Sequence, residues 1–222
     1  MGESHRIFLV RHGETDWNKD LKYQGNSDIE LNEAGIEQAR RLGVRLRGTI
    51  PARVVSSPLS RACRTAEVIM ENNGGDAKIE KLEDLREISF GIWEGLSMSD
   101  VRNVDGETLD KWKARPFSIT PKGGETLEEI IARSKRAAAN ILEYGRPGAA
   151  TFVVAHGAIL RSVLAALMGV EDIDILWRFR VDNCSLTIVD MWGRRPSLYA
   201  LNDTHHCRLG SDEEIGRLAF SL

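Results

Sequence analysis

Residues 7–18 read IFLVRHGETDWN and are the most informative part of the sequence. The first four of these residues form a continuous apolar run, which is typical of a strand buried on both faces. The strand ends at Arg11 and His12, so a guanidinium and an imidazole stand where the run stops. A second apolar run, residues 150–155, ends in the same way at His156. Because ligands bind beyond the carboxyl ends of parallel strands, the two histidines are predicted to frame one pocket.

Short apolar runs alternate along the chain with amphipathic segments. Strands are predicted at residues 6–11, 52–56, 150–155, 185–190 and 197–201. The clearest helix is predicted over residues 126–144, where apolar side chains recur at helical spacing and Gly145 follows the end. Other helices are predicted over residues 33–48, with Asn32 as N-cap, and from about Ser60. This alternation favours an α/β layered fold with a largely parallel sheet.

The last two predicted strands are separated by residues 192–196, WGRRP, a polar turn that predicts a hairpin and an antiparallel sheet edge. The longest stretch without clear periodicity, residues 83–124, is rich in glycine and proline. Such a segment usually caps an active site, although a plain surface excursion would have the same pattern. With no repeat and no linker, residues 1–222 are predicted to form a single domain with this irregular, cap-like segment at about 84–124.

The composition excludes several classes of protein. A net charge of −3 argues against a broad nucleic-acid or membrane-binding surface, so any anion site must be local. No apolar segment is long enough to span a membrane, and the start of the chain, with Glu3 and His5, lacks the features of a signal peptide. A cytoplasmic location is therefore expected. The three scattered cysteines predict neither a disulfide framework nor a metal knuckle.

Residues 56–67, SSPLSRACRTAE, add to the predicted pocket. A strand stops at Pro58 and a helix begins with Arg61 in its first turn, so its N-terminal amides favour an anion. Arg11 and Arg61 can clamp a phosphoryl group, because each guanidinium is a planar fork of donors. At an effective dielectric of about 20, one charge pair at ~4 Å gives about 4 kcal/mol before desolvation. The positive charges at the pocket can thus outweigh the net charge of −3 of the whole chain.

An imidazole held among fixed positive charges is a good nucleophile toward a phosphate monoester. The arginines disfavour protonation of His12, provided that a backbone acceptor holds the other ring nitrogen. Asn18, Gln24 and the backbone around Gly25 are candidate further donors, although loop amides are often only solvated. The residues therefore favour phosphoryl transfer through a phosphohistidine.

A proton must also reach the leaving oxygen when the phosphoryl group departs. The candidate acid is Glu87, within residues 85–95, LREISFGIWEG. From the residues alone, Glu14, Glu94 and Glu125 compete with it on equal terms.

The ordered series of motifs resembles the histidine phosphatase superfamily, also called phosphoglycerate mutase-like, along nearly the whole chain. The series comprises RHGE at residues 11–14, SSP at residues 56–58 with Arg61, Glu87 with Gly91, and His156 with Gly157. The resemblance implies a three-layer α/β/α sandwich around a mostly parallel, mixed central sheet.

The same resemblance implies roles for individual residues. His12 would be the phosphorylated nucleophile, and Glu87 the proton donor that later serves as base for the incoming water. The phosphate pocket would be formed by Arg11, Arg61 and His156. The positions that match residues lining the site in relatives are Asn18, Gln24, Gly25 and Gly157. Neither a metal nor a cofactor is implied.

Residues 87–95 and the run KGGET at 122–126 resemble the phosphatase branch, which includes α-ribazole phosphatases, phosphoserine phosphatases and broad-specificity members. Mutases usually carry an Arg and a Tyr after the equivalent of Glu87, and their chains are typically longer. The expected function is therefore hydrolysis of a small phosphorylated metabolite by a histidine acid phosphatase-type phosphoric monoester hydrolase. A cofactor-dependent phosphoglycerate mutase and a noncatalytic phosphate-binding protein on the same fold are the alternatives.

A zinc site on His205, His206 and Cys207 is another alternative. Adjacent residues rarely ligate one metal with good geometry, and further ligands are not evident, so an exposed or edge-packed histidine pair is expected. Residues 201–206 resemble a C-terminal segment common in the family, which leaves open whether either histidine approaches the pocket. The expected partner is a small phosphorylated metabolite, with no nucleic acid and no membrane; pairing into a homodimer is left open.

Overall fold

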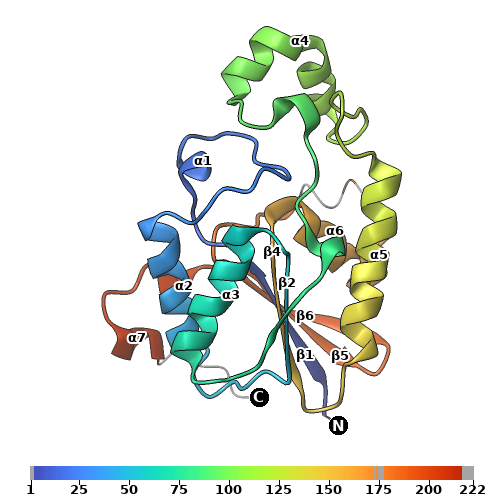
Figure 1. Cartoon of the computed structure of the whole chain (residues 1–222). Coiled ribbons are helices and arrows are strands. Elements are labelled where there is room, and N and C mark those ends of the chain that lie inside the picture. The colour runs from blue at the N-terminus through green and yellow to red at the C-terminus, as the bar shows by residue number, and fades with distance from the viewer. Residues whose placement is uncertain (1–2, 173, 175–177, 217–222) are drawn as a thin grey trace.

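A six-stranded mixed sheet forms the centre of the computed structural model, which describes residues 3–172, 174 and 178–216. The strands are β1 (His5–Arg11), β2 (Arg53–Ser56), β3 (Ile79–Lys81), β4 (Ala150–Ala155), β5 (Leu186–Trp192) and β6 (Arg195–Asp203). Their order is β3-β2-β4-β1-β5-β6. The pairs β2–β3, β2–β4 and β1–β4 are parallel, whereas β1–β5 and β5–β6 are antiparallel. The predicted mostly parallel sheet with an antiparallel edge is confirmed (Figure 1).

Helices cover both faces of this sheet. The α-helices are α1 (Asp16–Lys19), α2 (Glu33–Arg45), α3 (Ser60–Asn73), α4 (Met98–Ala114), α5 (Leu127–Glu143), α6 (Gly157–Met168) and α7 (Asp212–Gly216). Short 3-10 helices are η1 (Glu83–Leu85), η2 (Gly91–Trp93) and η4 (His205–Cys207). In Figure 1, α2 and α3 lie on one side of the sheet and α5 and α6 on the other, while α4 stands beyond its upper end. The three-layer arrangement is therefore as expected.

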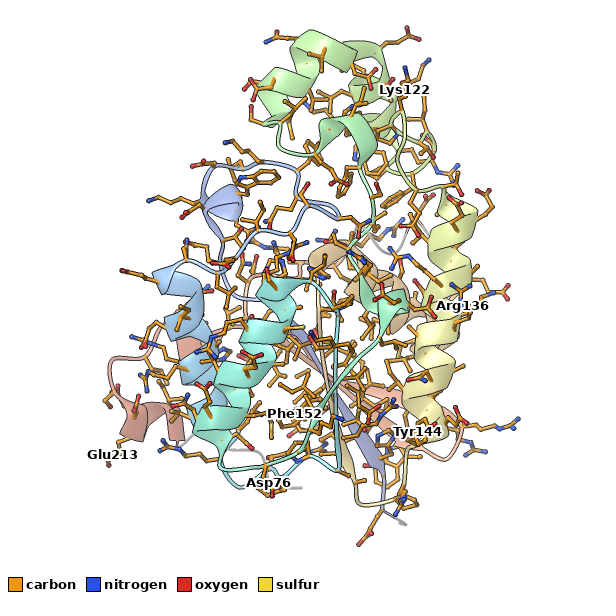
Figure 2. The ribbon with its side chains drawn as sticks, viewed as in Figure 1. Asp76, Lys122, Arg136, Tyr144, Phe152 and Glu213 are labelled. Atoms are coloured by element: carbon orange, nitrogen blue, oxygen red, sulfur yellow. The ribbon has the colours of Figure 1, made fainter. Side chains whose placement is uncertain are left out.

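The core divides according to the alternation of strand β1. Ile7 and Leu9 pack with residues of α5 and α6, whereas Phe8 and Val10 pack with residues of α2 and α3. Successive side chains of a strand point to opposite faces, so one four-residue apolar run supports both layers. Phe152 of β4 meets Phe8 edge-on, with ring centroids 5.1 Å apart, and Figure 2 shows it in the interior. This packing fixes the end of β1, where His12 follows.

The segment predicted to lack regular structure contains the 17-residue helix α4. Ser97 caps α4, but Asp105 interrupts it with non-helical angles (φ −151°, ψ 46°), so neither half is long enough to show a clear apolar period. The side chain of Asp105 accepts a hydrogen bond from Trp93 Nε1 at 2.8 Å. A separate apolar cluster holds this region together: Ile88, Trp93, Val101, Leu109, Trp112, Phe117 and Ile130.

Other element boundaries differ from the prediction by a few residues. Helix α5 has Thr126 as its N-cap in a capping box, as its sequence indicates, but Leu142 at its end is exposed instead of packed. Helix α2 ends at Arg45, three residues early. Strand β6 begins at Arg195 and includes Pro196. Proline has no backbone N–H to donate, and sheets tolerate this in an edge strand such as β6. The short strand β3 was not predicted.

Candidate active site

His12 and His156 lie side by side at the ends of two adjacent strands. In the parallel pairing of β1 with β4, Arg11 is opposite Ala155, so the next residue of each strand is a histidine. Their ring centroids are 5.0 Å apart, and both side chains are buried. The structure thus brings together the two histidines that the sequence predicted to share a pocket.

The ring of His12 is oriented by its own loop. Nδ1 lies 2.7 Å from the carbonyl oxygen of Gly13. A carbonyl can only accept, so Nδ1 carries the proton and Nε2 has a free lone pair. Burial and the positive charges of Arg61 and Arg11 hold the pKa of His12 well below its usual value. The backbone acceptor that the sequence argument required is present, and the ring is neutral at physiological pH.

Arg61 joins His156 to the loop that follows helix α1. Its Nε donates to His156 Nδ1 at 3.1 Å, while Nη1 and Nη2 donate to the carbonyls of Ser27 and Gly25 at 2.7 and 2.8 Å. Because no carboxylate of the described residues pairs with it directly, burial lowers the pKa of Arg61 to about 10, and it stays cationic at neutral pH. Arg61 is completely buried, in the first turn of α3 as predicted.

His156 makes contacts through both ring nitrogens. Since Nδ1 accepts from Arg61, Nε2 carries the proton, and it donates to Ser57 Oγ at 2.7 Å. Burial and the charge of Arg61 hold the pKa of His156 well below its usual value. His156 is therefore a neutral residue that links Arg61 to Ser57, and the Ser57 hydroxyl keeps its own proton for a further acceptor.

Arg11 is a partly buried cation with one buried, unused donor. Its Nη1 donates to Val181 O at 2.7 Å, but Nε has no hydrogen-bond partner among the described residues. Burial lowers its pKa, with the charge of Glu87 acting in the opposite direction. The guanidinium lies against Gly157, the first residue of α6. A buried donor without a partner is costly, so an anion bound here would satisfy it.

Glu87 lies at the N-terminus of α6, the helix that follows His156. Its carboxylate accepts from the amides of Ala158 and Ile159 at 3.2 and 3.1 Å, and from Ile88 N at 3.0 Å. Helix α6 begins immediately after His156, so these bonds place Glu87 at the carboxyl end of β4. The electrostatic influence of Glu87 reaches both Arg11 and Arg61.

The other three glutamates are held in structural contacts. Glu94 organises a loop by accepting from the amides of Asn26, Ser27 and Phe90. Glu125 pairs with Arg133 through two hydrogen bonds, and Glu14 accepts from Asn32 at 3.0 Å. Among the four candidates, Glu87 is the one whose carboxylate accepts from the first amides of α6, the helix that follows His156.

The predicted loop donors surround the same end of the sheet. Asn18 Oδ1 accepts from the amide and hydroxyl of Thr15, so the Nδ2 protons of Asn18 are the donors it can offer to a ligand. Gln24 is buried, and its Oε1 has no hydrogen-bond partner among the described residues. Gly25 has a φ of +54°, and a Cβ there would collide with the Glu94 carboxylate, so only glycine fits. Its carbonyl positions Arg61.

Two polar residues near the site were not predicted. Arg161 lies one helical turn after Gly157 on α6, and its charge acts on Arg11. Residues four apart lie on the same face of a helix, so the position four residues after Gly157 could have been predicted to lie near the site. Asn183 contacts the His12 loop from the segment before β5, and no periodic pattern marks it.

The C-terminal histidines separate in the structure. His205 is exposed, whereas His206 is buried, with Nδ1 3.1 Å from Arg45 and Nε2 3.1 Å from Cys184 O. The positive charge of Arg45 lowers the affinity of the His206 imidazole for a metal cation. Burial raises the pKa of the Cys207 thiol to about 11, which disfavours the thiolate form that binds metals. Across residues 3–172, 174 and 178–216, no three His, Cys, Asp or Glu side chains are grouped to hold a metal. His206 instead contacts Cys184, whose amide donates to the carbonyls of Arg11 and His12.

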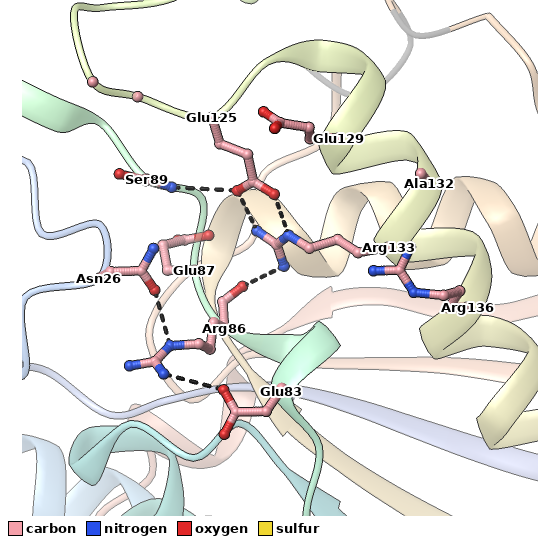
Figure 3. Close-up of a pocket in the computed structure, with 12 residues that line it drawn as sticks. Asn26, Glu83, Arg86, Glu87, Ser89, Glu125, Glu129, Ala132, Arg133 and Arg136 are labelled. Carbon is pink, nitrogen blue, oxygen red and sulfur yellow. Dashed lines mark hydrogen bonds and ion pairs between the residues drawn. The ribbon is translucent and has the colours of Figure 1, made fainter.

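Glu87 lines a groove of about 530 Å³ (Figure 3). Its lining residues are Asn26, Glu83, Arg86, Glu87, Ser89, Gly123, Gly124, Glu125, Glu129, Ala132, Arg133 and Arg136. Figure 3 shows Arg133 bound to Glu125, and Arg86 bound to Asn26 and Glu83, among these lining residues. Polar side chains therefore dominate the space next to the candidate proton donor.

The family follows from comparison with known proteins. The family model for the histidine phosphatase superfamily (branch 1) matches residues 7–204. The chain belongs to this superfamily. The resemblance read from the motifs is confirmed, and the motif residues are the ones that the structure gathers at one end of the sheet.

Relatives within the superfamily include several activities. The chain is 33% identical over 208 residues to phosphoserine phosphatase 1 of Hydrogenobacter thermophilus, covering 92% of this chain and 94% of that protein. It is 33% identical over 194 residues to the Salmonella arizonae protein named "Probable phosphoglycerate mutase GpmB", covering 83% and 84%. The solved structure of the α-ribazole phosphatase of Shigella flexneri superposes with a TM-score of 0.81, at 29% identity, covering 90% and 96%.

None of the helices within the described part of the chain has the length and apolar character needed to cross a membrane.

Proposed function

We propose that this histidine phosphatase superfamily member is a phosphomonoesterase that hydrolyses a small phosphorylated metabolite through a phosphohistidine at His12. The observation that carries the proposal is the hydrogen bond from His12 Nδ1 to Gly13 O, which leaves Nε2 free beside the buried Arg61 and the partly buried Arg11. A neutral, oriented imidazole in a cationic pocket can attack phosphorus without first losing a proton. The phosphatase names of the relatives support the same reaction.

The first step transfers the phosphoryl group to the enzyme. Arg11 and Arg61 hold the nonbridging oxygens, and Nε2 of His12 attacks phosphorus in line with the ester oxygen. The N–P bond forms while the ester P–O bond breaks, and protonated Glu87 gives its proton to the leaving oxygen. The fixed arginines stabilise the charge on the phosphoryl oxygens throughout this step.

The second step returns the enzyme to its starting state. The carboxylate of Glu87 accepts a proton from a water molecule as the water oxygen attacks phosphorus. The N–P bond breaks, inorganic phosphate leaves, and Glu87 is again protonated. One residue thus serves as acid and then as base on the same side of the phosphoryl group.

The groove beside Glu87 is the proposed site of the alcohol portion of the substrate. The proton donor must face the leaving oxygen, so the alcohol extends from Glu87 into the space that Glu87 itself lines. The polar lining fits a hydroxylated or charged alcohol better than an apolar one. The names of the relatives imply serine and α-ribazole as the released alcohols, and both are polar.

Hydrolysis and mutase activity are separated by the fate of the phosphoryl group. A mutase must shield its phosphohistidine from water, whereas the groove beside Glu87 includes the strongly exposed side chains of Glu83 and Arg136. The test is a panel of phosphoserine, α-ribazole phosphate, 3-phosphoglycerate and sugar phosphates, with and without 2,3-bisphosphoglycerate. Release of inorganic phosphate supports the hydrolase, and isomer formation without phosphate release supports the mutase. No reaction with any ester, including p-nitrophenyl phosphate, would support a noncatalytic phosphate-binding protein.

Catalysis without metal or other cofactor, a cytoplasmic location and assembly into a homodimer stay predictions. So does the organisation of the chain as one domain with a cap. The proposed residue roles for Asn18, Gln24, Gly25, His156 and Gly157 in holding phosphate rest on their positions around His12 and on the family resemblance.

A further inference from the structure

Asn183 contacts the nucleophile loop from a distant part of the chain. Its Nδ2 lies 3.1 Å from each of three oxygens: the carbonyls of His12 and Gly13 and Oδ1 of Asn18. The residue comes just before β5 and is not among the residues expected to form the site. It touches none of the atoms assigned to the reaction.

The orientation of the Asn183 amide follows from these partners. Backbone carbonyls only accept hydrogen bonds, and Asn18 Oδ1 is identified as oxygen because it accepts from the amide of Thr15. The NH₂ group of Asn183 must therefore face all three oxygens. The opposite orientation would place oxygen against oxygen.

One of these oxygens controls the His12 ring. Gly13 O accepts from His12 Nδ1 at 2.7 Å, and it also accepts from Asn183. If this carbonyl rotated away, Nδ1 would lose its acceptor, and the tautomer with a free Nε2 would lose its advantage. The same amide group also anchors Asn18, whose Nδ2 donors are available to a ligand.

The backbone next to Asn183 adds a second brace. Cys184 has a φ of +50°, and its amide donates to the carbonyls of Arg11 and His12 at 3.1 and 3.2 Å. The Cys184 carbonyl accepts from His206 Nε2, because Nδ1 of His206 is occupied by the Arg45 guanidinium. Asn183 thus projects from a well-supported segment rather than from a free loop.

We propose that Asn183 is a positioning residue for phosphoryl transfer: by holding the Gly13 carbonyl and Asn18, it keeps His12 in the Nδ1-protonated orientation that leaves Nε2 free to attack. This inference rests on the proposed function for its catalytic meaning. The orientation of the His12 ring is a property of the resting protein, so it can be measured separately.

The test uses Asn183→Ala and the nearly isosteric Asn183→Asp, which keeps the shape but removes the donors. Asn72→Ala is the matched control, since Asn72 Nδ2 also donates to a backbone carbonyl, Val68 O at 2.8 Å, on α3. The rate of phosphoenzyme formation in a single turnover should fall by about tenfold in both Asn183 variants, as expected for losing a hydrogen bond that orients a reacting group. KM should change less, and the control should match the wild type.

Histidine ¹⁵N NMR gives the second readout. The wild-type His12 spectrum should be that of a single Nδ1-protonated tautomer, and both Asn183 variants should show a mixture. The added charge in Asn183→Asp should also raise the pKa of His12 and move the acid limb of the kcat/KM profile to higher pH.

Three outcomes overturn the proposal: an unchanged His12 spectrum in both variants, a wild-type rate of phosphoenzyme formation, or equal effects in Asn72→Ala. If Asn183→Ala does not fold, the same criteria apply to Asn183→Asp. Failure of the proposed function would look different, because the wild type would then form no phosphohistidine while its tautomer could still depend on Asn183.

Discussion

The amide of Gly13 donates a hydrogen bond to the hydroxyl of Thr65 at 3.0 Å, and the same hydroxyl donates to the carbonyl of Arg61 at 2.7 Å. Gly13 follows His12 at the end of β1, whereas Thr65 lies on α3, the helix that carries Arg61. One buried hydroxyl therefore sets the position of the His12 loop relative to the arginine that faces it.

Replacing Thr65 by Val should destabilise the protein while keeping the volume of the side chain. The amide of Gly13 would lose its acceptor in a buried place, which costs roughly 1–3 kcal/mol of unfolding free energy. Denaturant unfolding measures this change. Thr65→Ser, which keeps the hydroxyl, is the control and should lose less; equal losses would mean that the methyl packing, not the hydrogen bond, stabilises the junction.

Arg61→Ala should lower kcat/KM by roughly 100-fold, because a donor to the transition state is worth about 3 kcal/mol. It should also change the pH profile. The charge of Arg61 helps to hold the pKa of His12 below its usual value, so its loss raises that pKa. His12 would then become protonated at a higher pH on acidification, and the acid limb of kcat/KM should move upward.

The control for Arg61 is Arg64→Ala, which removes an exposed arginine of the same helix that pairs with Glu67 and Glu71. Its profile, measured with the same ester, should coincide with that of the wild type. An acid limb that stays in place in Arg61→Ala would show that this guanidinium does not govern the protonation of His12.

Glu87→Gln should slow esters in proportion to their need for a proton on the leaving oxygen. An alkyl ester such as glycerol 3-phosphate needs that proton, whereas nitrophenolate leaves readily without it. The measurement is the ratio of the two rates in Glu87→Gln. This ratio is compared with the same ratio in the wild type and in Glu83→Gln, a variant at the exposed edge of the groove. Equal slowing of both esters would assign the acid role to another group.

Arg86→Met should weaken binding of substrates with a polar alcohol. Arg86 binds Asn26 through Nε and the strongly exposed Glu83 through Nη1, and a surface ion pair of this kind contributes at most about 1 kcal/mol. Its guanidinium can therefore turn to a ligand in the groove. KM for phosphoserine should rise by about tenfold, as for loss of a charge-assisted hydrogen bond, with little change for p-nitrophenyl phosphate.

Arg136→Met is the comparison for Arg86, because Arg136 is bound by Asp84 through two hydrogen bonds. This bidentate pair with one carboxylate holds the guanidinium more firmly than the separate bonds of Arg86 do, so the KM values of Arg136→Met should stay near those of the wild type. If Arg86→Met binds phosphoserine as tightly as the wild type, the groove does not hold the alcohol portion of the substrate.

Much of the fold could be predicted because local patterns determine it. The apolar run of β1 supplies both layers of the core, and Asn32 and Thr126 mark the starts of α2 and α5. Helix α4 escaped prediction because Asp105 breaks its period, and β3, at three residues, is too short to leave a pattern.

The site was predictable where strand ends and family motifs coincide. His12, His156 and Arg61 follow directly from the ends of β1 and β4 and the start of α3. The preference for Glu87 over Glu94 and Glu125 depends on which backbone amides each carboxylate meets, and those contacts are tertiary. Asn183 lies far from His12 in the sequence, and only the folded structure shows that it contacts the His12 loop.

The central claim is that His12 accepts the phosphoryl group on Nε2. The most direct measurement is rapid quenching of the enzyme at alkaline pH during turnover of a phosphomonoester, followed by mass spectrometry of the peptide that contains residue 12 and ³¹P NMR of the intact adduct. The account predicts an acid-labile phosphoramidate on Nε2 of His12, present in the wild type and absent, together with turnover, in His12→Ala. Robust turnover by His12→Ala, or a phosphoryl group on another residue, would contradict it.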